Sequence, residues 1–558
     1  MQIPKTQQAI QLIGPNQLRL NPAKEVFTPG PHQILVRVEA VGLCFSDLKL
    51  LKQFDSHPRK SEILSGIDPA ILPQVPSYCP GLKPTVPGHE IFCTIVAVGQ
   101  QVQRHQTGQR VLVQTDFRWL KTAGSNAAIG YNFEGALQQY LLLDERIIVD
   151  PESGESFLIP TEGGLGASAA ALVEPWACVE SSYLYEERRA ALSGGRLLIA
   201  AEKGQTIQGV QECFAGSETV ASAVCFCMED KQADAIKKIG LPSVRVESLE
   251  DLKNGSFDDI LYFGNQKERI ELLNDKLAAK GILNIILGSQ RIGKPVSIDV
   301  GRVHYGMTRL IGTVGSNASE SYRSIPQTGE IRDGDRATVV GAGGPMGQMH
   351  VIRLICAGKK NLSLTATDLD DGRLASLESK VRPLLERHKA EYRSINTQKS
   401  PDADSYSYFA LMAPVGALVA QAVEHSRPAA LINIFAGIPA GVKQELNLDR
   451  YIENRCYMFG TSGSRREDMK VVLEKALSGQ LDTNCSVDAV SGMAGAIDGI
   501  RAVENRALPG KIVVYPALTK MPLLTLAEVC RRYPSVADKL RGGIWTKEAE
   551  QELMKTAE

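Results

Sequence analysis

The sequence predicts an α/β protein in which a β-rich domain precedes two tandem units, each built around a parallel β-sheet. Short β segments separated by Gly and Pro turns fill roughly residues 1–150. From about residue 160, apolar strand-like runs alternate with helical patterns, and this second region repeats internally. The 558 residues exceed what one hydrophobic core accommodates, so several domains are expected.

Composition excludes several classes of function. The net charge is −1, from 62 basic and 63 acidic residues without a long charge run, which argues against a nucleic-acid partner or an anionic membrane surface. The N-terminus lacks a secretory signal pattern, and no run of 18 apolar residues predicts a membrane span. The 11 cysteines are scattered without a CxxC pair. A reducing, cytoplasmic location is therefore expected.

The β-rich region has the pattern of a small β-barrel. Residues 33–39, 91–98 and 110–113 are its clearest strands, and turns such as the one at 86–88 separate them. Residues 51–84 show little periodicity. We interpret them as a long loop over a cleft or as an ordered insertion.

Three ordered matches reveal the internal repeat. Residues 194–204 correspond to 334–344, 283–288 to 432–437, and 311–316 to 459–464, with spacings near 140 at the start and 148–149 later. We infer two tandem α/β units, 188–329 and 330–475. The alternative is one long, irregular sheet.

The second unit carries a dinucleotide-binding pattern. An apolar strand leads into Gly341, Gly343 and Gly347, and a helical pattern follows. Gly341 suits the tight turn, Gly343 or Gly344 lets the backbone approach a pyrophosphate, and Gly347 lets the helix pack on the strand. The residues between them, Pro345 and Met346, begin the helix whose N-terminus would face the phosphates.

Asp368 ends the next predicted strand, about 20 residues past the last glycine, where an acidic side chain binds the adenosine ribose. A carboxylate there repels a 2′-phosphate, so NAD is preferred over NADP. In the first unit, Ala201, Lys203 and Ile207 replace the three glycines, which marks that unit as degenerate. The alternative for the second unit is a glycine turn that binds no ligand.

Three residues before position 180 could ligate a metal ion. Cys44 offers a thiolate, His89 an imidazole and Glu174 a carboxylate. A catalytic zinc ion takes three such protein ligands and keeps one position open. Ser46 is close enough to Cys44 in sequence to relay a proton from the substrate alcohol.

These motifs together resemble the zinc-containing medium-chain dehydrogenase/reductase superfamily. The resemblance rests on residues 42–47 and 86–90 as ligand motifs, 174–178 as the third-ligand segment, 341–347 as the nucleotide loop and 508–514 as a closing strand. Glu174 is similar to the glutamate ligand of the polyol (sorbitol) dehydrogenase branch, and within it the chain looks closest to L-sorbose-1-phosphate reductase-like enzymes. The barrel is then GroES-like, and both α/β units are Rossmann-type.

The resemblance implies hydride transfer between NAD(H) and a secondary alcohol, polyol or sugar (phosphate), with the active site between barrel and second unit. One catalytic zinc is implied. No structural zinc is expected, because residues 114–131 contain no cysteine. Asp47 would position the ligand loop, and Glu90 would orient His89 or ligate the metal itself. Cys79 and His57 are alternative ligands, and His304 is a further candidate site residue.

The implied organisation is a catalytic domain over 1–187, a return segment over 476–516 and a helical extension over 517–558. A homodimer or homotetramer is expected. Two other functions remain open: a catalytically inactive nucleotide-binding or scaffold protein derived from this family, and a zinc-free quinone-type reductase.

Overall fold

The computed structural model describes residues 3–161, 163–216, 220–241 and 243–557. They form two compact units: unit 1 comprises Met1–Cys178 and Ser464–Glu558, and unit 2 comprises Val179–Gly463. Within the described ranges, no helix combines the length and the apolar character needed to cross a membrane.

Unit 1 is built on an eight-stranded sheet that joins both ends of the chain. The strand order is β10-β6-β5-β3-β26-β25-β27, and β9 also pairs with β3. The helices and strands of unit 1 are β1 (Thr6–Gly14), β2 (Gln17–Glu25), β3 (Gln33–Gly42), α1 (Phe45–Gln53), β4 (Ile63–Ser65), β5 (Glu90–Val98), β6 (Arg110–Val113), β7 (Asp116–Thr122), β8 (Ser125–Ala128), β9 (Tyr140–Asp144), α2 (Glu145–Ile148), β10 (Leu158–Pro160), α3 (Ala167–Ala171), α4 (Val173–Leu184), α13 (Arg466–Leu477), β25 (Val487–Ser491), α14 (Ala496–Glu504), β26 (Lys511–Val514), β27 (Leu524–Thr525), α15 (Leu526–Arg532), α16 (Pro534–Ala537) and α17 (Lys547–Thr556). The antiparallel pairing of β26 with β3 brings Lys511 beside residues 41–43, although more than 450 positions separate them.

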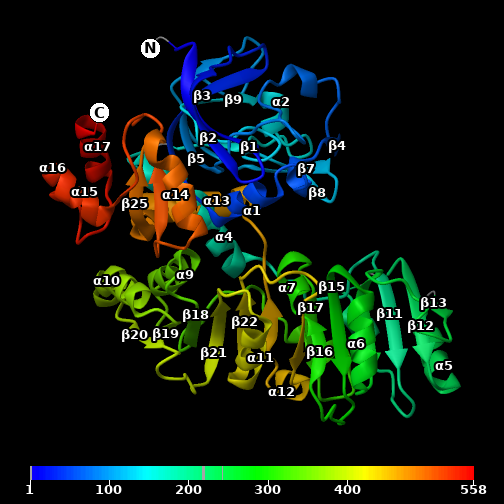
Figure 1. Ribbon diagram of the computed structural model, residues 1–558. Helices are drawn as coiled ribbons and strands as arrows, with labels where there is room; N and C mark the ends of the chain where they lie inside the picture. The colour runs from blue at the N-terminus through cyan, green and yellow to red at the C-terminus, as the bar shows by residue number, and fades with distance from the viewer. Residues whose placement is uncertain (1–2, 162, 217–219, 242, 558) are drawn as a thin grey trace. The chain divides into compact units, whose positions relative to one another are not determined.

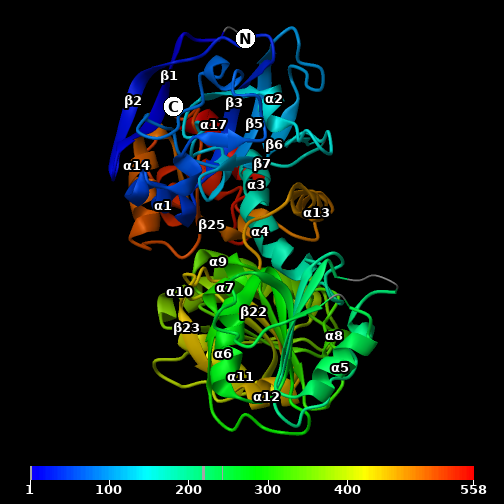
Figure 2. The ribbon, with the colours of Figure 1, turned by 90° about the vertical axis from the view of Figure 1, so that its right-hand side faces the viewer.

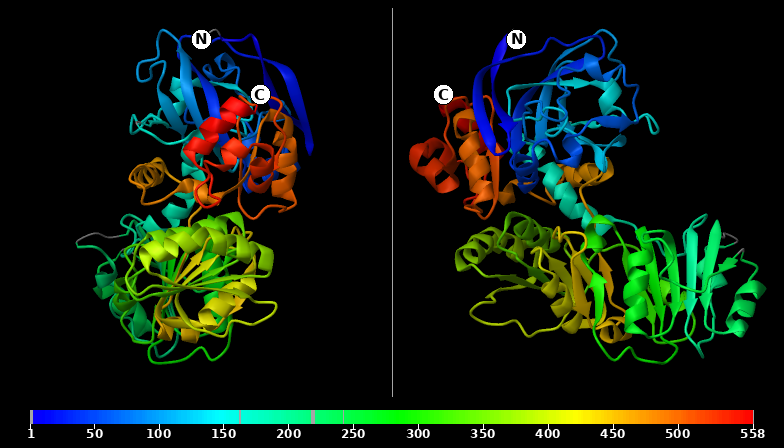
Figure 3. Two further views of the ribbon diagram at one scale, coloured as in Figure 1. Left: turned by 90° about the vertical axis from the view of Figure 1, so that its left-hand side faces the viewer. Right: turned by 45° about the vertical axis from the view of Figure 1, so that its right-hand side comes forward.

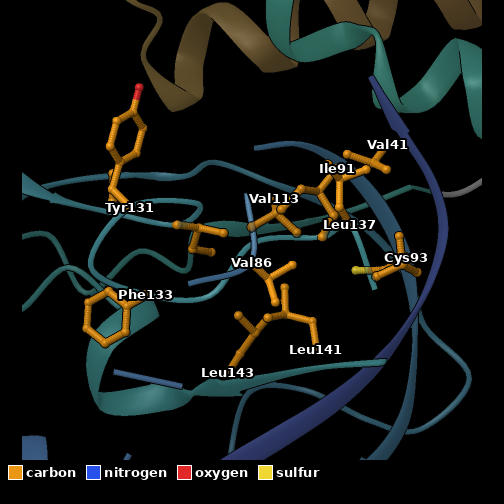
Figure 4. Packing of buried hydrophobic residues seen from close by; sticks show 14 of the residues in the cluster. Val41, Val86, Ile91, Cys93, Val113, Tyr131, Phe133, Leu137, Leu141 and Leu143 are labelled. Atoms are coloured by element: carbon orange, nitrogen blue, oxygen red, sulfur yellow. The ribbon is translucent and has the colours of Figure 1, made fainter. Parts of the chain in front are cut away.

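Alternating apolar residues on these strands supply the core of unit 1. Val41, Ile91 and Val113 each come from a different strand and are almost fully buried. Figure 4 shows them gathered with Leu137 and Leu141 in one cluster. Burial of such branched side chains contributes about 1.5–3 kcal/mol each, which makes this region a rigid base for the residues at its edge.

The C-terminal extension is anchored in unit 1. Thr525 and Glu528 form a capping box at the start of α15. Trp545 is fully buried and donates a hydrogen bond from Nε1 to Tyr515 Oη at 2.8 Å. Glu550 of α17 accepts hydrogen bonds from the backbone amides of Ala167 and Ser168, so α17 packs against α3 (Figure 2). The extension is part of the fold of this unit.

Unit 2 contains two parallel sheets with one topology. The orders are β13-β12-β11-β14-β15-β17 and β20-β19-β18-β21-β22-β24, so each sheet has the order 3-2-1-4-5-6 of a dinucleotide-binding fold. The helices and strands are β11 (Arg196–Ala201), β12 (Ser222–Cys227), α5 (Asp230–Lys238), β13 (Ser243–Arg245), β14 (Phe257–Phe263), α6 (Lys267–Lys276), β15 (Leu277–Ile286), β16 (Val296–Asp299), α7 (Gly301–Tyr305), β17 (Arg309–Thr313), α8 (Ser319–Arg323), β18 (Arg336–Val340), α9 (Pro345–Cys356), β19 (Ser363–Asp368), α10 (Asp371–His388), β20 (Glu391–Asn396), β21 (Tyr406–Leu411), α11 (Gly416–Glu424), β22 (Ser426–Ile434), β23 (Lys443–Leu446), α12 (Leu448–Glu453) and β24 (Tyr457–Phe459). The predicted tandem repeat is confirmed. We call the β11–β17 sheet with its helices the first copy, and the β18–β24 sheet with its helices the second copy.

The two copies contact each other through equivalent elements. The sixth strands β17 and β24 lie side by side, and β16 pairs with β23 in an antiparallel ladder (Figures 1 and 3). Asp299 of the first copy accepts a hydrogen bond from Gly441 N at 3.1 Å, and Asp449 of the second accepts one from Gly293 N at 2.8 Å. Each copy thus contributes a glycine amide as donor and an aspartate as acceptor to the contact. One apolar core, with members from both copies, runs through it.

Several boundaries differ from those expected from the sequence. Helix α4 continues from unit 1 into unit 2, so the first boundary falls at residue 178 and not at 187. The second copy's sheet ends with β24, and α13 belongs to unit 1, so the expected boundary at 475 moves to 463. Residues 51–84 are an ordered insertion: they contain the end of α1, two short 3₁₀ helices and β4, which pairs with β7.

Candidate metal and dinucleotide sites

The first turn of α1 holds three of the predicted site residues. Cys44 precedes the helix, and its backbone N–H donates to Asp47 Oδ2 at 3.2 Å, which fixes the turn. Ser46 Oγ donates to Cys44 Sγ at 3.0 Å and lies 3.2 Å from His89 Nε2. The hydroxyl therefore bridges the thiol and the imidazole.

Asp47 orients His89. The Oδ1 atom of Asp47 lies 2.9 Å from His89 Nδ1, and both side chains are buried. This contact leaves Nε2 directed at Cys44 and Ser46, as in the carboxylate–histidine–metal arrangement of metal centres. Burial by itself lowers the pKa of His89, but Asp47 and Cys44 together raise the pKa well above 6.5.

Glu90 is the third member of this cluster. Cys44, His89 and Glu90 each offer one ligand atom, and these three atoms lie within 4.8 Å of one another. Among the described residues, this is the one group of three or more such side chains close enough to hold a metal ion. Glu90 is fully buried, and its Oε1 pairs with Lys511 Nζ at 2.5 Å. Its Oε2 has no hydrogen-bond partner. A buried carboxylate oxygen without a partner is costly, and a cation at this point would satisfy it.

Glu174, the third ligand expected from the sequence, is near this cluster but is not part of it. It lies in the first turn of α4, and Cys178 Sγ donates to its Oε1 at 3.7 Å. Burial raises the pKa of Glu174 to about 7, while the charge of His89 opposes this rise. The structure therefore brings Glu90, and not Glu174, within 4.8 Å of both Cys44 and His89.

The ordered insertion reaches the side of the same cluster. The ring of Tyr131 lies 6.5 Å from that of His89 and 4.9 Å from that of His57, between the metal candidates and the insertion. The guanidinium of Arg59 lies 5.6 Å from the Tyr131 ring and pairs with Asp116 at 2.6 Å. Desolvation lowers the pKa of His57 to about 4, so this imidazole is neutral at pH 7.

The two alternative ligands suggested by the sequence have other partners. Cys79 is buried and donates to Thr85 Oγ1 at 3.1 Å, and burial raises the pKa of its thiol to about 11. His57 Nδ1 accepts a hydrogen bond from Arg59 N. Lys511 was missed by the sequence analysis. Its only signal was a lysine at the start of an apolar strand.

The glycine loop of the second copy has the geometry expected of a dinucleotide site. Gly341 follows β18 at a positive φ of 82°, which glycine adopts without strain. A Cβ on Gly347 would lie 2.2 Å from Gly341 O, so α9 can approach the strand only because residue 347 has no side chain. Gly344 caps α9, Pro345 is its first residue, and Met346 follows.

Asp368 closes this loop at the end of β19. Its Oδ2 accepts a hydrogen bond from Gly343 N at 2.8 Å. A Cβ on Gly344 would meet nothing closer than Gly341 O at 3.9 Å, so the space over the first turn of α9 is open. Free N–H groups at this helix N-terminus suit a pyrophosphate, and the adjacent carboxylate suits a ribose.

The first copy lacks the element that would hold phosphates. Over described residues 202–216, β11 is followed by a loop and a single 3₁₀ turn, with no α-helix in the position of α9. Glu229 still accepts a hydrogen bond from Gly204 N, as Asp368 does from Gly343 N. The side chain of Glu202, however, lies in the loop itself, where it pairs with Arg269 at 2.6 Å. The first copy is thus degenerate, as predicted.

His304 lies at the contact between the two copies. It is buried, and its Nδ1 is 3.2 Å from Ile434 O. His304 thus contacts the end of β22 and is not one of the three clustered metal-ligand candidates.

Comparison with known proteins agrees with this architecture. Residues 30–152 match the model of the alcohol dehydrogenase GroES-like domain. The uncharacterized protein YggP of Escherichia coli is 23% identical over 56% of this chain and 75% of its own length. The uncharacterized zinc-type alcohol dehydrogenase-like protein YphC of Escherichia coli is 28% identical over 22% of this chain and 34% of its own. The 2R,3R-butanediol dehydrogenase from Bacillus subtilis matches the fold with a TM-score of 0.51, 14% identity, and coverage of 92% of this chain and 100% of its own.

Residues 30–152 therefore form a GroES-like domain of the alcohol dehydrogenase type, and both sheets of unit 2 have the strand order of dinucleotide-binding folds. The likeness to the 2R,3R-butanediol dehydrogenase shows that the fold is shared.

Proposed function

We propose that the chain is a zinc-dependent oxidoreductase that transfers a hydride between NAD(H) and a secondary alcohol, polyol or sugar derivative. The observation that carries this proposal is the cluster of Cys44, His89 and Glu90, in which a buried carboxylate oxygen lacks a partner. Thiolate, imidazole and carboxylate are the ligand types that catalytic zinc takes. A zinc ion held there would supply a Lewis acid, and NAD would carry the hydride.

The protein's own residues would hold and move the proton. Asp47 keeps the Nδ1–H tautomer of His89, so Nε2 is available as a ligand. Ser46 Oγ, within hydrogen-bond distance of both Cys44 and His89, can accept a hydrogen bond from the substrate hydroxyl and would relay its proton by releasing its own proton toward water. Lys511 balances the charge of Glu90. In this proposal Glu90 is the third ligand, and Glu174 is the alternative.

The polar side chains of the insertion support a hydroxyl-rich substrate. His57 and Arg59 of the insertion, together with Asp116 of β7, lie around Tyr131 at the side of the cluster, and polar groups there favour a hydroxyl-bearing substrate over an apolar one. Asp368 supports NAD over NADP, since its charge repels a 2′-phosphate. None of the eleven cysteines, all of which lie among the described residues, forms a disulfide, which supports a reducing location such as the cytoplasm.

Metal analysis and a matched pair of variants test the zinc site. The purified chain should contain about one zinc, as expected of a catalytic site. Glu90→Gln should weaken zinc binding by at least about 10-fold, as loss of metal-site partners does, and Glu174→Gln should change it less. Glu90→Gln leaves the buried charge of Lys511 without its partner. The double variant Glu90→Gln/Lys511→Met removes that charge too, so it shows whether the loss of zinc binding comes from the missing carboxylate or from the unpaired lysine. Absence of zinc binding at neutral pH would refute the proposal in favour of a scaffold.

A substrate panel tests the reaction. Polyols, aldoses, ketoses and their phosphates are assayed with NAD(H) and with NADP(H). Turnover with NAD(H) that a chelator abolishes supports the proposal. Oxidation of NADH that survives the chelator would instead favour a zinc-free quinone-type reductase.

A further inference from the structure

The first copy, which has no α-helix over described residues 202–216 where a phosphate-binding helix would lie, contacts the second copy near the place where a dinucleotide would bind. Its helix α7 makes this contact. A Cβ on Gly301, the first residue of α7, would lie 2.0 Å from Pro439 O, and a Cβ on Gly460 would lie 3.1 Å from His304 Cα. Glycine at both positions permits a backbone-to-backbone approach that any side chain would block.

The segment that α7 touches follows β22, the fifth strand of the second copy. In a sheet of order 3-2-1-4-5-6 the ligand lies over the carboxyl ends of the strands, where the order reverses between β18 and β21. Asp368 at the end of β19 and the loop before α9 lie on the side of the adenosine half. The carboxyl ends of β21 and β22 lie on the other side of the reversal, which is the side of the nicotinamide half.

Tyr305 extends from α7 to this segment. A Cβ built on Gly437 would lie 2.4 Å from Tyr305 Oη, so the phenol touches the backbone three residues past the end of β22. The ring packs edge-on against His304 at 4.7 Å, and His304 is held at Ile434 O. Tyr305 keeps 43% of its surface exposed, so part of its side chain can meet a ligand.

We propose that Tyr305, a residue of the degenerate copy, contacts the nicotinamide half of a dinucleotide bound by the second copy. This inference rests on the proposed function, because it needs a dinucleotide there. The hydroxyl can donate to the carboxamide or the ribose, and the ring can pack on the nicotinamide. The first copy is then a part of the second copy's coenzyme site, which gives it a role that does not require its own nucleotide.

Binding of whole and half ligands tests this assignment. Titration of the purified full chain with NADH is compared with titration with ADP, which lacks the nicotinamide half. Tyr305→Ala should weaken NADH binding about 3- to 10-fold, the range of one lost hydrogen bond with its packing, and should leave ADP binding unchanged. The NADH affinity of Tyr305→Phe should lie between that of the unaltered chain and that of Tyr305→Ala, because Tyr305→Phe loses only the hydroxyl.

Met228→Ala is the matched control. Met228 is 47% exposed and lies at the carboxyl end of β12 in the first copy, where that copy would have bound its own nucleotide. This variant should bind both ligands normally. Unchanged NADH binding by Tyr305→Ala would overturn the inference, and equal loss of NADH and ADP would overturn it in favour of a structural role. If the unaltered chain binds neither ligand, the proposed function itself fails.

Discussion

At the scale of single residues, the candidate metal site is organised around His89, whose Nδ1 lies 2.9 Å from Asp47 Oδ1 and whose Nε2 lies 3.2 Å from Ser46 Oγ. The sequence singled out Cys44, His89 and Ser46 from the order of short motifs, and the structure brings these side chains together. The order of short motifs was sufficient for these residues because they lie on adjoining turns. The choice between Glu90 and Glu174 as the third ligand candidate depends on where α4 lies relative to the start of β5. No sequence pattern contains that information.

Lys511 explains why the two roles offered for Glu90, orienting His89 or ligating the metal, could not be separated from the sequence. The lysine is 421 positions from the carboxylate, and only the pairing of β26 with β3 brings them together. Removing one partner of a buried ion pair costs about 3–5 kcal/mol. The pair thus fixes one oxygen of Glu90 and leaves the other directed at the cluster.

The contact between Asp47 and His89 gives a direct prediction for metal affinity. Asp47→Asn keeps the shape but removes the negative charge that orients and polarises the imidazole. Zinc affinity should fall about 10- to 100-fold, as it does when such partners are changed. Competition with a zinc-binding dye measures it. Asp144→Asn, which changes a buried carboxylate at the start of α2, is the control and should bind zinc normally.

Glu174 gives a prediction about pH. Burial, the largest cause, raises the pKa of Glu174 to about 7 from 4.5 in the metal-free protein. The folded state therefore retains a proton that the unfolded state loses, and stability from this group falls as the pH rises from 4.5 to 7.

Glu174→Gln is neutral at every pH and avoids that loss. At pH 8 the chelator-treated variant should be more stable than the unaltered chain by roughly 3 kcal/mol, and at pH 5 by much less. Urea unfolding at the two pH values measures the difference. A stability gain of equal size at pH 5 and at pH 8 would show that Glu174 is ionised at both pH values and would contradict the prediction.

At the scale of elements, the two repeated sheets were predictable from the sequence. The structural change in the first copy's nucleotide loop was predictable only in part. Strand-like runs at matching intervals indicated both sheets, and both have the predicted parallel pattern. The loss of glycines at 201, 203 and 207 indicated a degenerate loop, but the spacing between strands is nearly the same in both copies. The absence of the helix from described residues 202–216 could not be seen, because a loop of equal length occupies its place.

Two glycines of the second copy should separate folding from binding. Gly347→Ala puts a Cβ 2.2 Å from a backbone oxygen, so α9 must shift, at a cost of about 1–3 kcal/mol. Gly344→Ala meets open space and should leave stability unchanged, but its methyl group lies where a pyrophosphate would approach. Thermal unfolding and ADP titration distinguish the two. Normal ADP binding by Gly344→Ala would argue against a phosphate at this helix.

At the scale of the whole molecule, the internal pair of copies changes the expected assembly. The sequence led us to predict a homodimer or homotetramer, which stays a prediction. Within unit 2, however, β17 already lies beside β24, and Arg309 of β17 forms a buried ion pair with Glu187 at 2.8 Å. The β24 edge of the second copy's sheet is therefore covered by β17 of the same chain.

Removal of the first copy should expose that edge. A chain lacking residues 188–329 loses the partner of β24 and the cover of Tyr451 and Met458, which are buried in the shared core. Unpaired strand edges with apolar neighbours drive self-association. Light scattering after size exclusion should show that the deleted chain forms dimers or larger particles, with the full chain at equal concentration as the reference. If the deleted chain is a stable monomer that binds NADH as well as the full chain, the first copy neither protects the edge nor contributes Tyr305 to the coenzyme site.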